Sequence, residues 1–305
     1  MPLDKDVVSV VKFFRDLPFD ASMSAREYRE RVHGIFLSMT SAIKEEVAEV
    51  EDRTIKGRES ELSIRIYRQK RWSPAMVFYH GGGFVIGNIE IYDPLCRRIA
   101  RIANATVISV EYRLAPEHKF PSAVIDAYDA LKWVADNSGD LEIDSDRIVV
   151  SGDSAGGNLA TVASLIARDQ GESFIRKQIL VYPVVNMSFP TPSRLEFGER
   201  YGILTTEIMR WFAEQYLRSE EDKYNPLASP IFADLSNLPP ALIITAEYDP
   251  LRDEGEIYGE LMRRYGSEAV VVRYKGMIHG FLNFYPLLRA GREAINQIAA
   301  AVSEV

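Results

Sequence analysis

Several residue types and patterns are scarce in this chain, and each absence argues against a class of protein. Cys96 is the only cysteine among 305 residues, so no intrachain disulfide can form and a disulfide-stapled secreted fold is excluded. The chain has 36 Lys and Arg against 44 Asp and Glu, a formal net charge of -8, which argues against a nucleic-acid-binding surface. No apolar run approaches the roughly 18 residues that a membrane-spanning helix needs.

Signals for export and for cofactors are also missing. The opening stretch MPLDKDVVSVVKFF has early acidic residues and no small-residue cleavage site after an apolar core. The sequence has four histidines and no H-E-x-x-H, and neither G-x-x-x-x-G-K-[ST] nor G-x-G-x-x-G occurs at a strand-to-helix junction. We therefore expect a soluble, cytoplasmic protein with no metal, no cofactor, and no nucleic-acid or membrane partner.

The chain contains instead an alternation of apolar strands and helices. Leu62, Ile64 and Ile66 alternate with more polar residues, and with the segment from Val47 they predict a half-buried antiparallel edge. Later runs are almost continuously apolar, as in strands covered on both faces: 75–80, 105–112, 147–152, 178–185, 241–248 and 269–274. Helical segments separate most of these runs, which predicts an α/β fold with a doubly wound, mostly parallel sheet.

Two regions fall outside this alternation. Apolar residues at helical spacing predict amphipathic helices at 7–17 and 25–45, before any strand. Residues 186–240 are too long for a simple crossover and contain a loop (NMSFPTPSR), a helix (TEIMRWFAEQYL) and a proline-rich return. We interpret this second region as an insertion.

The segment GDSAGG places Ser154 between a predicted strand and a predicted helix. A sharp turn there forces the serine into a strained backbone conformation, and Gly152 and Gly156 lack the Cβ atoms that would collide with neighbouring backbone. The following helix directs free N–H groups and its positive dipole end towards charge beside the hydroxyl. This G-x-S-x-G pattern is typical of a nucleophile elbow, although the short motif alone is weak evidence.

A serine hydroxyl needs a general base, and His279 is the best-placed histidine. It follows the strand at 269–274 and so lies, like Ser154, at the carboxyl end of a strand. The other three histidines have plainer interpretations: His33 as a solvated helix residue, His118 as a structural hydrogen bonder in a loop, and His80 as part of the framework of the HGGG loop.

The base needs an anionic partner, for which we select Asp249. It ends the strand at 241–248 and gives the order Ser, Asp, His that an α/β-hydrolase sheet imposes. Glu247, expected on the opposite face of the strand, and Asp253, expected to cap the next helix, are weaker alternatives. Asp153 is expected to serve hydrogen bonds within its own turn.

A tetrahedral intermediate also needs donors for its oxyanion. Three glycines follow the strand at 75–80 in the segment HGGG, where bare backbone N–H groups approach a substrate oxygen closely. We select Gly82 and Gly83, joined by the amide of Ala155. A merely flexible turn is the alternative for these glycines.

Five segments together resemble the hormone-sensitive-lipase family of carboxylesterases: HGGGF (80–84), EYRLAPEHKFP (111–121), GDSAGGN (152–158), DPLRDEG (249–255) and IHGF (278–281). The resemblance runs from about residue 50 onward, with Lys119 where many relatives have proline. It implies an α/β-hydrolase fold, a mostly parallel eight-stranded sheet flanked by helices with a helical cap. It also implies the same roles for the triad and oxyanion residues, and makes a homodimer plausible.

The resemblance further implies a division of the chain. N-terminal cap helices occupy 1–50, the hydrolase core occupies 51–185 and 223–305, and a cap insertion occupies 186–222. The helix at 205–217 would then lie over the active site, with candidate substrate-pocket residues Phe84, Met209, Trp211 and Phe212. The alternative is that the large side chains of this helix only pack the cap onto the sheet.

These observations predict a serine carboxylesterase that hydrolyses short- to medium-chain acyl esters through an acyl-enzyme intermediate. Its partner would be a small hydrophobic ester. The alternatives are an amidase or lactonase with the same triad, or a non-catalytic small-molecule receptor on the same scaffold. His279 argues against the receptor, because related plant hormone receptors lack the catalytic histidine.

Overall fold

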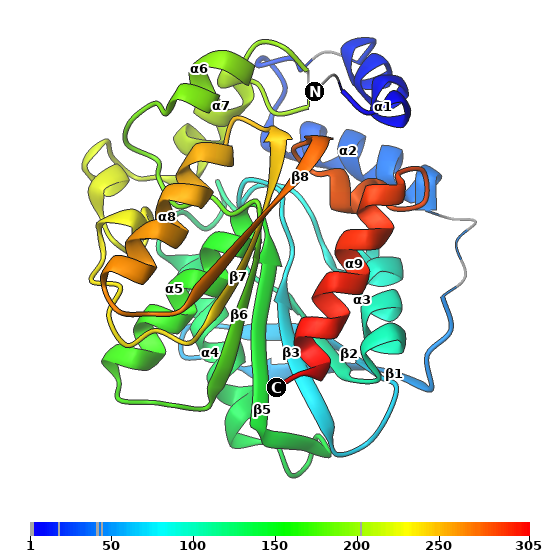
Figure 1. Cartoon of the computed structure of the whole chain (residues 1–305), viewed down its shortest axis with the longest axis vertical. Helices are drawn as coiled ribbons and strands as arrows, with labels where there is room; N and C mark the ends of the chain where they lie inside the picture. The colour runs from blue at the N-terminus through cyan, green and yellow to red at the C-terminus, as the bar shows by residue number, and fades with distance from the viewer. Residues whose placement is uncertain (1–2, 18, 41–42, 44, 202) are drawn as a thin grey trace.

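Eight strands form one sheet through the centre of the molecule (Figure 1). The computed structural model describes residues 3–17, 19–40, 43, 45–201 and 203–305. The spatial order of the strands is β1-β2-β4-β3-β5-β6-β7-β8. Their bounds are Glu49–Lys56 (β1), Glu61–Arg68 (β2), Ser73–Tyr79 (β3), Thr106–Glu111 (β4), Ile143–Asp153 (β5), Ile175–Val181 (β6), Ala241–Tyr248 (β7) and Ala269–Ile278 (β8).

The sheet is mostly parallel, with an antiparallel edge at β1 and β2. β2 pairs antiparallel with both β1 and β4, while the remaining five pairs, from β4–β3 to β7–β8, are parallel. Leu62, Ile64 and Ile66 of β2 are buried, whereas Ser63 between them is exposed. The predicted edge and the predicted sheet type are both confirmed.

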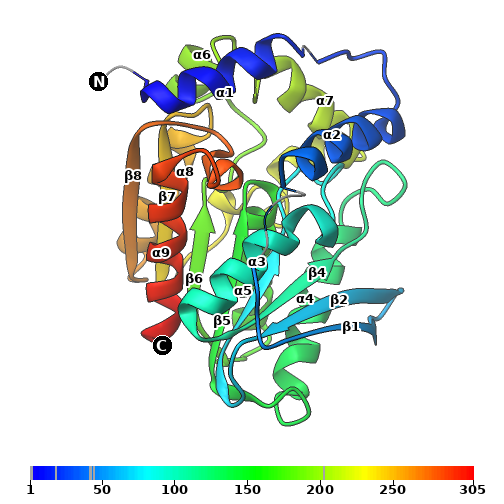
Figure 2. The same ribbon diagram turned by 90° about the vertical axis from the view of Figure 1, so that its right-hand side faces the viewer.

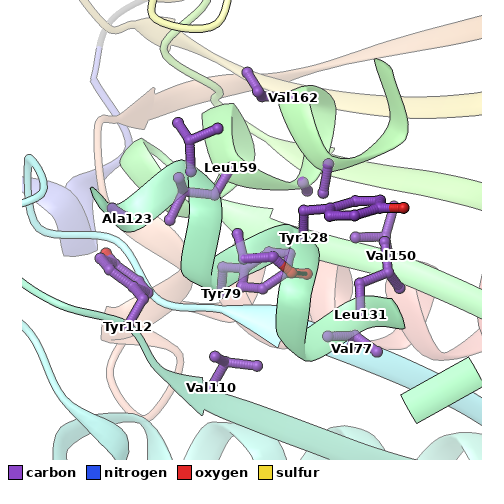
Figure 3. Close-up of a cluster of buried hydrophobic side chains, with 14 of the residues drawn as sticks. Val77, Tyr79, Val110, Tyr112, Ala123, Tyr128, Leu131, Val150, Leu159 and Val162 are labelled. Atoms are coloured by element: carbon purple, nitrogen blue, oxygen red, sulfur yellow. Dashed lines mark hydrogen bonds between the residues drawn. The ribbon is translucent and has the colours of Figure 1, made fainter. Parts of the chain in front are cut away.

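Helices cover both faces of the sheet (Figure 1). On one face lie α4 (Ser122–Asp136), α5 (Ala155–Asp169) and α8 (Arg252–Arg264), and on the other α3 (Ile89–Ala103) and α9 (Arg289–Ser303). Figure 3 shows part of the first face, where Val77 and Val150 of the sheet meet Leu131 and Leu159 of α4 and α5. Burial of these two apolar layers is the main favourable term in folding such a sheet.

Four further helices lie at one end of the sheet, over the carboxyl ends of the parallel strands (Figure 2). They are α1 (Lys5–Arg15), α2 (Ala25–Thr40), α6 (Pro192–Phe197) and α7 (Thr206–Tyr216), and we call them the cap. Short 3-10 helices complete the elements: η1 (Glu221–Tyr224), η2 (Pro230–Phe232) and η3 (Phe281–Phe284). Within the described ranges, no helix is both long and apolar enough to cross a bilayer.

Several predicted boundaries differ from the structure. In the sheet, β6 spans Ile175–Val181 where the sequence predicted 178–185, and β8 continues to Ile278, past the predicted residue 274. Helix α6 forms where the sequence predicted only a loop, because Thr191 is extended and Pro192 takes the first helical position, where its fixed φ favours a helix and its missing N–H is not needed. Helix α2 ends at Thr40, short of the predicted residue 45. Positions 41, 42 and 44 of that prediction lie outside the described residues.

Candidate active site

Ser154 occupies the turn between β5 and α5, at the carboxyl end of a central strand. Its φ of 56° and ψ of -115° are unusual for a residue with a side chain. The neighbouring glycines make this turn possible. A Cβ on Gly152 would lie 2.3 Å from the Gly156 backbone, and one on Gly156 would lie 1.9 Å from the carbonyl oxygen of Tyr79. Contact between backbone segments therefore determines where the serine hydroxyl sits.

The side chains of Ser154, His279 and Asp249 form a continuous chain of hydrogen bonds. His279 Nε2 is 3.0 Å from Ser154 Oγ, and His279 Nδ1 is 2.8 Å from Asp249 Oδ2. Asp249 is fully buried, whereas Ser154 and His279 each remain 8% exposed. When Nδ1–H donates to the carboxylate, Nε2 is free to accept a proton from the hydroxyl. The structure thus brings together the three residues selected from the sequence.

The two alternative acids have other partners. Glu247 accepts a hydrogen bond at 2.7 Å from a backbone amide of β8. Asp253, in the first turn of α8, accepts one at 2.7 Å from the amide of Ser193 in α6. Of these three carboxylates, Asp249 is the one within hydrogen-bonding distance of His279.

The remaining histidines lie outside this chain of bonds. His80 is buried, its Nδ1 lies 2.8 Å from the carbonyl oxygen of Gly81, and its ring stacks on Tyr112, so it belongs to the loop framework as expected. Burial lowers the pKa of His80 to about 4. His33 is half-buried rather than fully solvated, and the exposed side chain of His118 makes no hydrogen bond with the described residues, contrary to both expectations.

No cluster suited to a metal ion is found in the part of the chain that the structure describes. Such a cluster would need at least three His, Cys, Asp or Glu side chains close together.

Gly82 and Gly83 line the same cavity as Ser154. Gly82 and Gly83 follow β3 with φ values of 121° and 60°, which favour glycine. A Cβ on Gly82 would lie 2.1 Å from a carbonyl oxygen of the same turn, and one on Gly83 would lie 2.3 Å from the ring of Phe212. Ala155 is the first residue of α5, so its N–H has no acceptor within the helix. The positive helix end and this loop both favour negative charge beside Ser154.

A cavity of about 780 Å³ lies between the sheet end and the cap, and both Ser154 and His279 line it. Three of the four predicted pocket residues line it too: Phe84, Met209 and Phe212. Most of the other cap side chains on its wall are apolar. The cavity therefore suits a neutral, apolar molecule held against the serine.

Trp211 differs from the prediction, because it does not belong to the cavity wall. It is 7% exposed, and its ring lies edge-on to Phe19 at 5.5 Å and to Tyr28 at 5.3 Å between centroids. Its role in the described structure is to join α7 to the N-terminal part of the cap.

Comparison with known proteins agrees with this geometry. The sequence pattern of a family described as alpha/beta hydrolase fold matches residues 76–283, more than half of the chain. The chain belongs to this family. Its motifs place it in the hormone-sensitive-lipase-like group, so the resemblance seen in the sequence is confirmed.

Relatives of this α/β-hydrolase cover most or all of its length. It is 38% identical to an arylesterase of Saccharolobus solfataricus, over 100% of this chain and 99% of the relative. It is 42% identical to the carboxylic ester hydrolase LipN of Mycobacterium tuberculosis, over 83% of this chain and 70% of the relative. A solved hyperthermophilic esterase of the archaeon Pyrobaculum calidifontis has a TM-score of 0.98 at 52% identity and covers 100% of this chain and 99% of its own.

Sequence reasoning missed the contacts of Asp153, the residue that precedes Ser154 in this α/β-hydrolase. Its buried carboxylate accepts hydrogen bonds from the Gly81 amide at 2.8 Å, Tyr92 at 3.1 Å, Asn283 at 3.2 Å and Tyr182 at 3.4 Å. These partners lie on other segments, so the expectation that Asp153 serves its own turn is wrong. Burial raises the pKa of the carboxyl group. An acidic residue at the end of a buried strand was the available signal, but its partners depend on the tertiary fold.

Proposed function

We propose that this chain is a serine carboxylesterase that hydrolyses short- to medium-chain acyl esters through an acyl-enzyme intermediate. The observation that carries the proposal is the chain of hydrogen bonds from Asp249 through His279 to Ser154, 2.8 and 3.0 Å long, on the wall of an apolar cavity. The named arylesterase, carboxylic ester hydrolase and esterase relatives support ester hydrolysis as the reaction.

In the first half of the reaction Ser154 Oγ attacks the ester carbonyl while His279 Nε2 takes the hydroxyl proton. Asp249 holds the imidazole in the required tautomer and stabilises the imidazolium. The amides of Gly82, Gly83 and Ala155 receive the negative charge that develops on the carbonyl oxygen. The His279 proton then passes to the leaving alcohol, and the acyl group remains on the serine.

In the second half a water molecule takes the place of the alcohol. His279 removes its proton, the hydroxide attacks the acyl carbon, and the same amides again hold the oxyanion. Collapse of this intermediate releases the carboxylic acid, and the proton on His279 returns to Ser154. Every proton is returned within the cycle, so the reaction consumes only ester and water.

The cavity between the cap and the core supports the choice of substrate. We assign cap segments to 1–50 and 186–222, and the hydrolase core to 51–185 and 223–305. Phe84, Met209 and Phe212 line the cavity, and Phe84 stacks on Tyr216 of α7 with centroids 3.8 Å apart. A small hydrophobic ester gains affinity on such a wall, whereas an anionic substrate would lose its hydration there.

Two further proposals concern the setting of the enzyme. β8 is one of the two outer strands of the sheet and exposes Val270, so we propose that a homodimer forms through this edge. Light scattering on a size-exclusion column gives twice the 34.5 kDa chain mass if this is right, and the mass of one chain if it is wrong.

The single cysteine, Cys96, is buried and free, which is compatible with the cytoplasm that we propose as the compartment of this protein.

The direct test of the function is Ser154→Ala. The variant should lose at least about 1,000-fold in turnover of a short-chain aryl ester, because the nucleophile is gone, while circular dichroism shows an intact fold. Near wild-type turnover would refute the proposal. An amidase or lactonase with the same triad would be recognised by faster hydrolysis of aryl amides or lactones than of aryl esters. A receptor would be recognised by ligand binding without turnover.

A further inference from the structure

Arg29 of cap helix α2 reaches out of the cap and into the hydrolase core. Its Nε donates a hydrogen bond to the carbonyl oxygen of Val85 at 2.8 Å, and its Nη2 donates one to the carbonyl oxygen of Ala115 at 3.1 Å. The guanidinium also forms an ion pair with Glu117, Nη2 to Oε2 at 2.9 Å. The Arg29 side chain is 20% exposed and its bonds to the two carbonyl groups are partly buried, whereas Glu117 is 51% exposed and its ion pair faces water.

The two carbonyl groups belong to the support of the proposed oxyanion loop. The amide of Val85 donates to the Gly82 carbonyl oxygen at 3.0 Å, which closes the turn that contains Gly83. The amide of Ala115 donates to the Phe84 carbonyl oxygen at 2.9 Å, which ties this turn to the loop at 111–121. Arg29 binds the carbonyl oxygens of Val85 and Ala115. It therefore holds the turn that contains Gly83 against the loop at 111–121.

The chemistry of the side chain suits this position. A guanidinium presents its N–H groups in a rigid planar fork, so one arginine can serve two carbonyl groups and a carboxylate at once, which a lysine ammonium does with poorer geometry. The Arg29 guanidinium in turn holds the pKa of Glu117 below its usual value. Truncation would leave two partly buried carbonyl oxygens without this donor.

The same helix also forms part of the cavity wall. Tyr28, Val32 and Phe36 of α2 line the cavity, and Tyr28 packs on Trp211 of α7. A shift of α2 would therefore move these side chains on the cavity wall. Through Arg29 it would also move the turn that contains Gly82 and Gly83.

We propose that Arg29 is a positioning residue that couples the position of cap helix α2 on the core to the geometry of the oxyanion hole. The inference rests on the proposed esterase function. Arg29 does not touch the reacting atoms. It acts by holding the turn that presents the amides of Gly82 and Gly83, so its loss should weaken binding of the transition state more than binding of the substrate.

The test compares Arg29→Ala, Arg29→Lys and the matched control Arg26→Ala in the full-length enzyme. Arg26 lies on the same helix with an exposed side chain paired to Glu30. Arg29→Ala should lower kcat about tenfold with KM changed less than about threefold, because misplaced donors stabilise the oxyanion less. Its affinity for an aryl boronic acid, a transition-state analogue, should fall in parallel with kcat. Arg29→Lys should recover only part of the loss, and Arg26→Ala should match the wild type.

A second readout separates positioning from general stability. Active-site titration with a serine-reactive phosphonate counts the competent enzyme, so that kcat can be expressed per active site. Added guanidinium at millimolar concentration should restore part of the kcat of Arg29→Ala and should leave the kcat of Arg26→Ala unchanged. The inference is overturned if kcat per titrated site stays within about twofold of the wild type. It is also overturned if KM rises while boronic acid affinity is unchanged. Failure of the esterase function itself would show differently, as absent turnover in the wild type.

Discussion

The carboxyl end of the sheet and the cap hold their side chains in place by different kinds of contact. At the sheet end, added Cβ atoms on Gly152 and Gly156 would strike backbone atoms at 2.3 and 1.9 Å. In the cap, side chains meet side chains: Phe19, Tyr28 and Trp211 lie edge-on to one another with centroids 5.1 to 5.5 Å apart. Backbone contacts cannot be repacked, whereas aromatic side chains can adjust their rotamers.

This difference teaches which changes are tolerated in each region. Substitutions at the sheet end should abolish the chemistry, because the triad has one workable geometry. Substitutions in the cap should instead produce graded changes in stability and substrate binding. The predictions that follow test this contrast, beginning with the largest effect.

Asp249→Asn should cause the largest loss of kcat. Asp253→Asn, four residues later in the chain, is its control. Loss of the carboxylate charge leaves the imidazole in the wrong tautomer and should lower kcat about 1,000- to 10,000-fold. Asp253 binds the amide of Ser193, for which an asparagine oxygen can substitute, so its variant should lose less than about tenfold. Steady-state kinetics on an aryl ester checks both. Equal losses in the two variants would show that Asp249 has no special role.

Trp211→Ala and Phe212→Ala should separate stability from binding within one turn of α7. Trp211 is buried among aromatic rings outside the cavity wall, so its truncation should cost about 3 kcal/mol of unfolding free energy with KM nearly unchanged. Phe212 lines the cavity beside Gly83, so its truncation should raise KM about three- to tenfold with a smaller loss of stability. Denaturant unfolding and acyl-chain kinetics measure the two effects. The reverse assignment would contradict the placement of both rings.

His80 should have the smallest effect near neutral pH, because its contribution to stability changes only as the pH falls below its ordinary pKa. Its pKa is lowered to about 4 in the folded protein by burial, against an ordinary value of 6.5. Between these values the unfolded chain binds a proton that the folded protein does not, so stability is full above pH 6.5 and falls as the pH drops towards 4. The full difference corresponds to about 3 kcal/mol.

Denaturant unfolding across this pH range provides the check. His80→Gln should remove part of the slope, whereas the control His118→Gln, which changes an exposed histidine, should keep the wild-type slope. A His80→Gln profile as steep as the wild type would mean that His80 does not contribute to acid sensitivity.

The fold and the three triad side chains could be located from the sequence because both depend on local patterns. Apolar runs mark strands, and in a parallel sheet all strand ends of one kind meet at one edge. The run at 269–274 was expected to be covered on both faces, but it forms the edge strand β8 and exposes Val270, so that part of the prediction is wrong. Ser154, Asp249 and His279 each follow such a run, so their convergence follows from topology. The glycines around Ser154 add a steric requirement that is also local.

Other features could not be predicted because they depend on side-chain direction and long-range contacts. Trp211 and Phe212 are neighbours on a helix, about 100° apart around its axis, and the sequence does not say which ring faces the cavity. The bonds of Asp153 join segments up to 130 residues apart. Those of Arg29 connect a helix before the first strand to two loops of the core. No periodicity marks such partners in advance.

The most direct measurement of the central claim is covalent labelling with an aryl phosphonate followed by peptide mapping. If the hydroxyl of Ser154 is activated by His279 and Asp249, the wild type should carry one phosphonyl group on the peptide containing Ser154. His279→Ala should react at least about 100-fold more slowly, since a single base typically contributes that much. Labelling at another residue, or an unchanged rate in His279→Ala, would contradict the account.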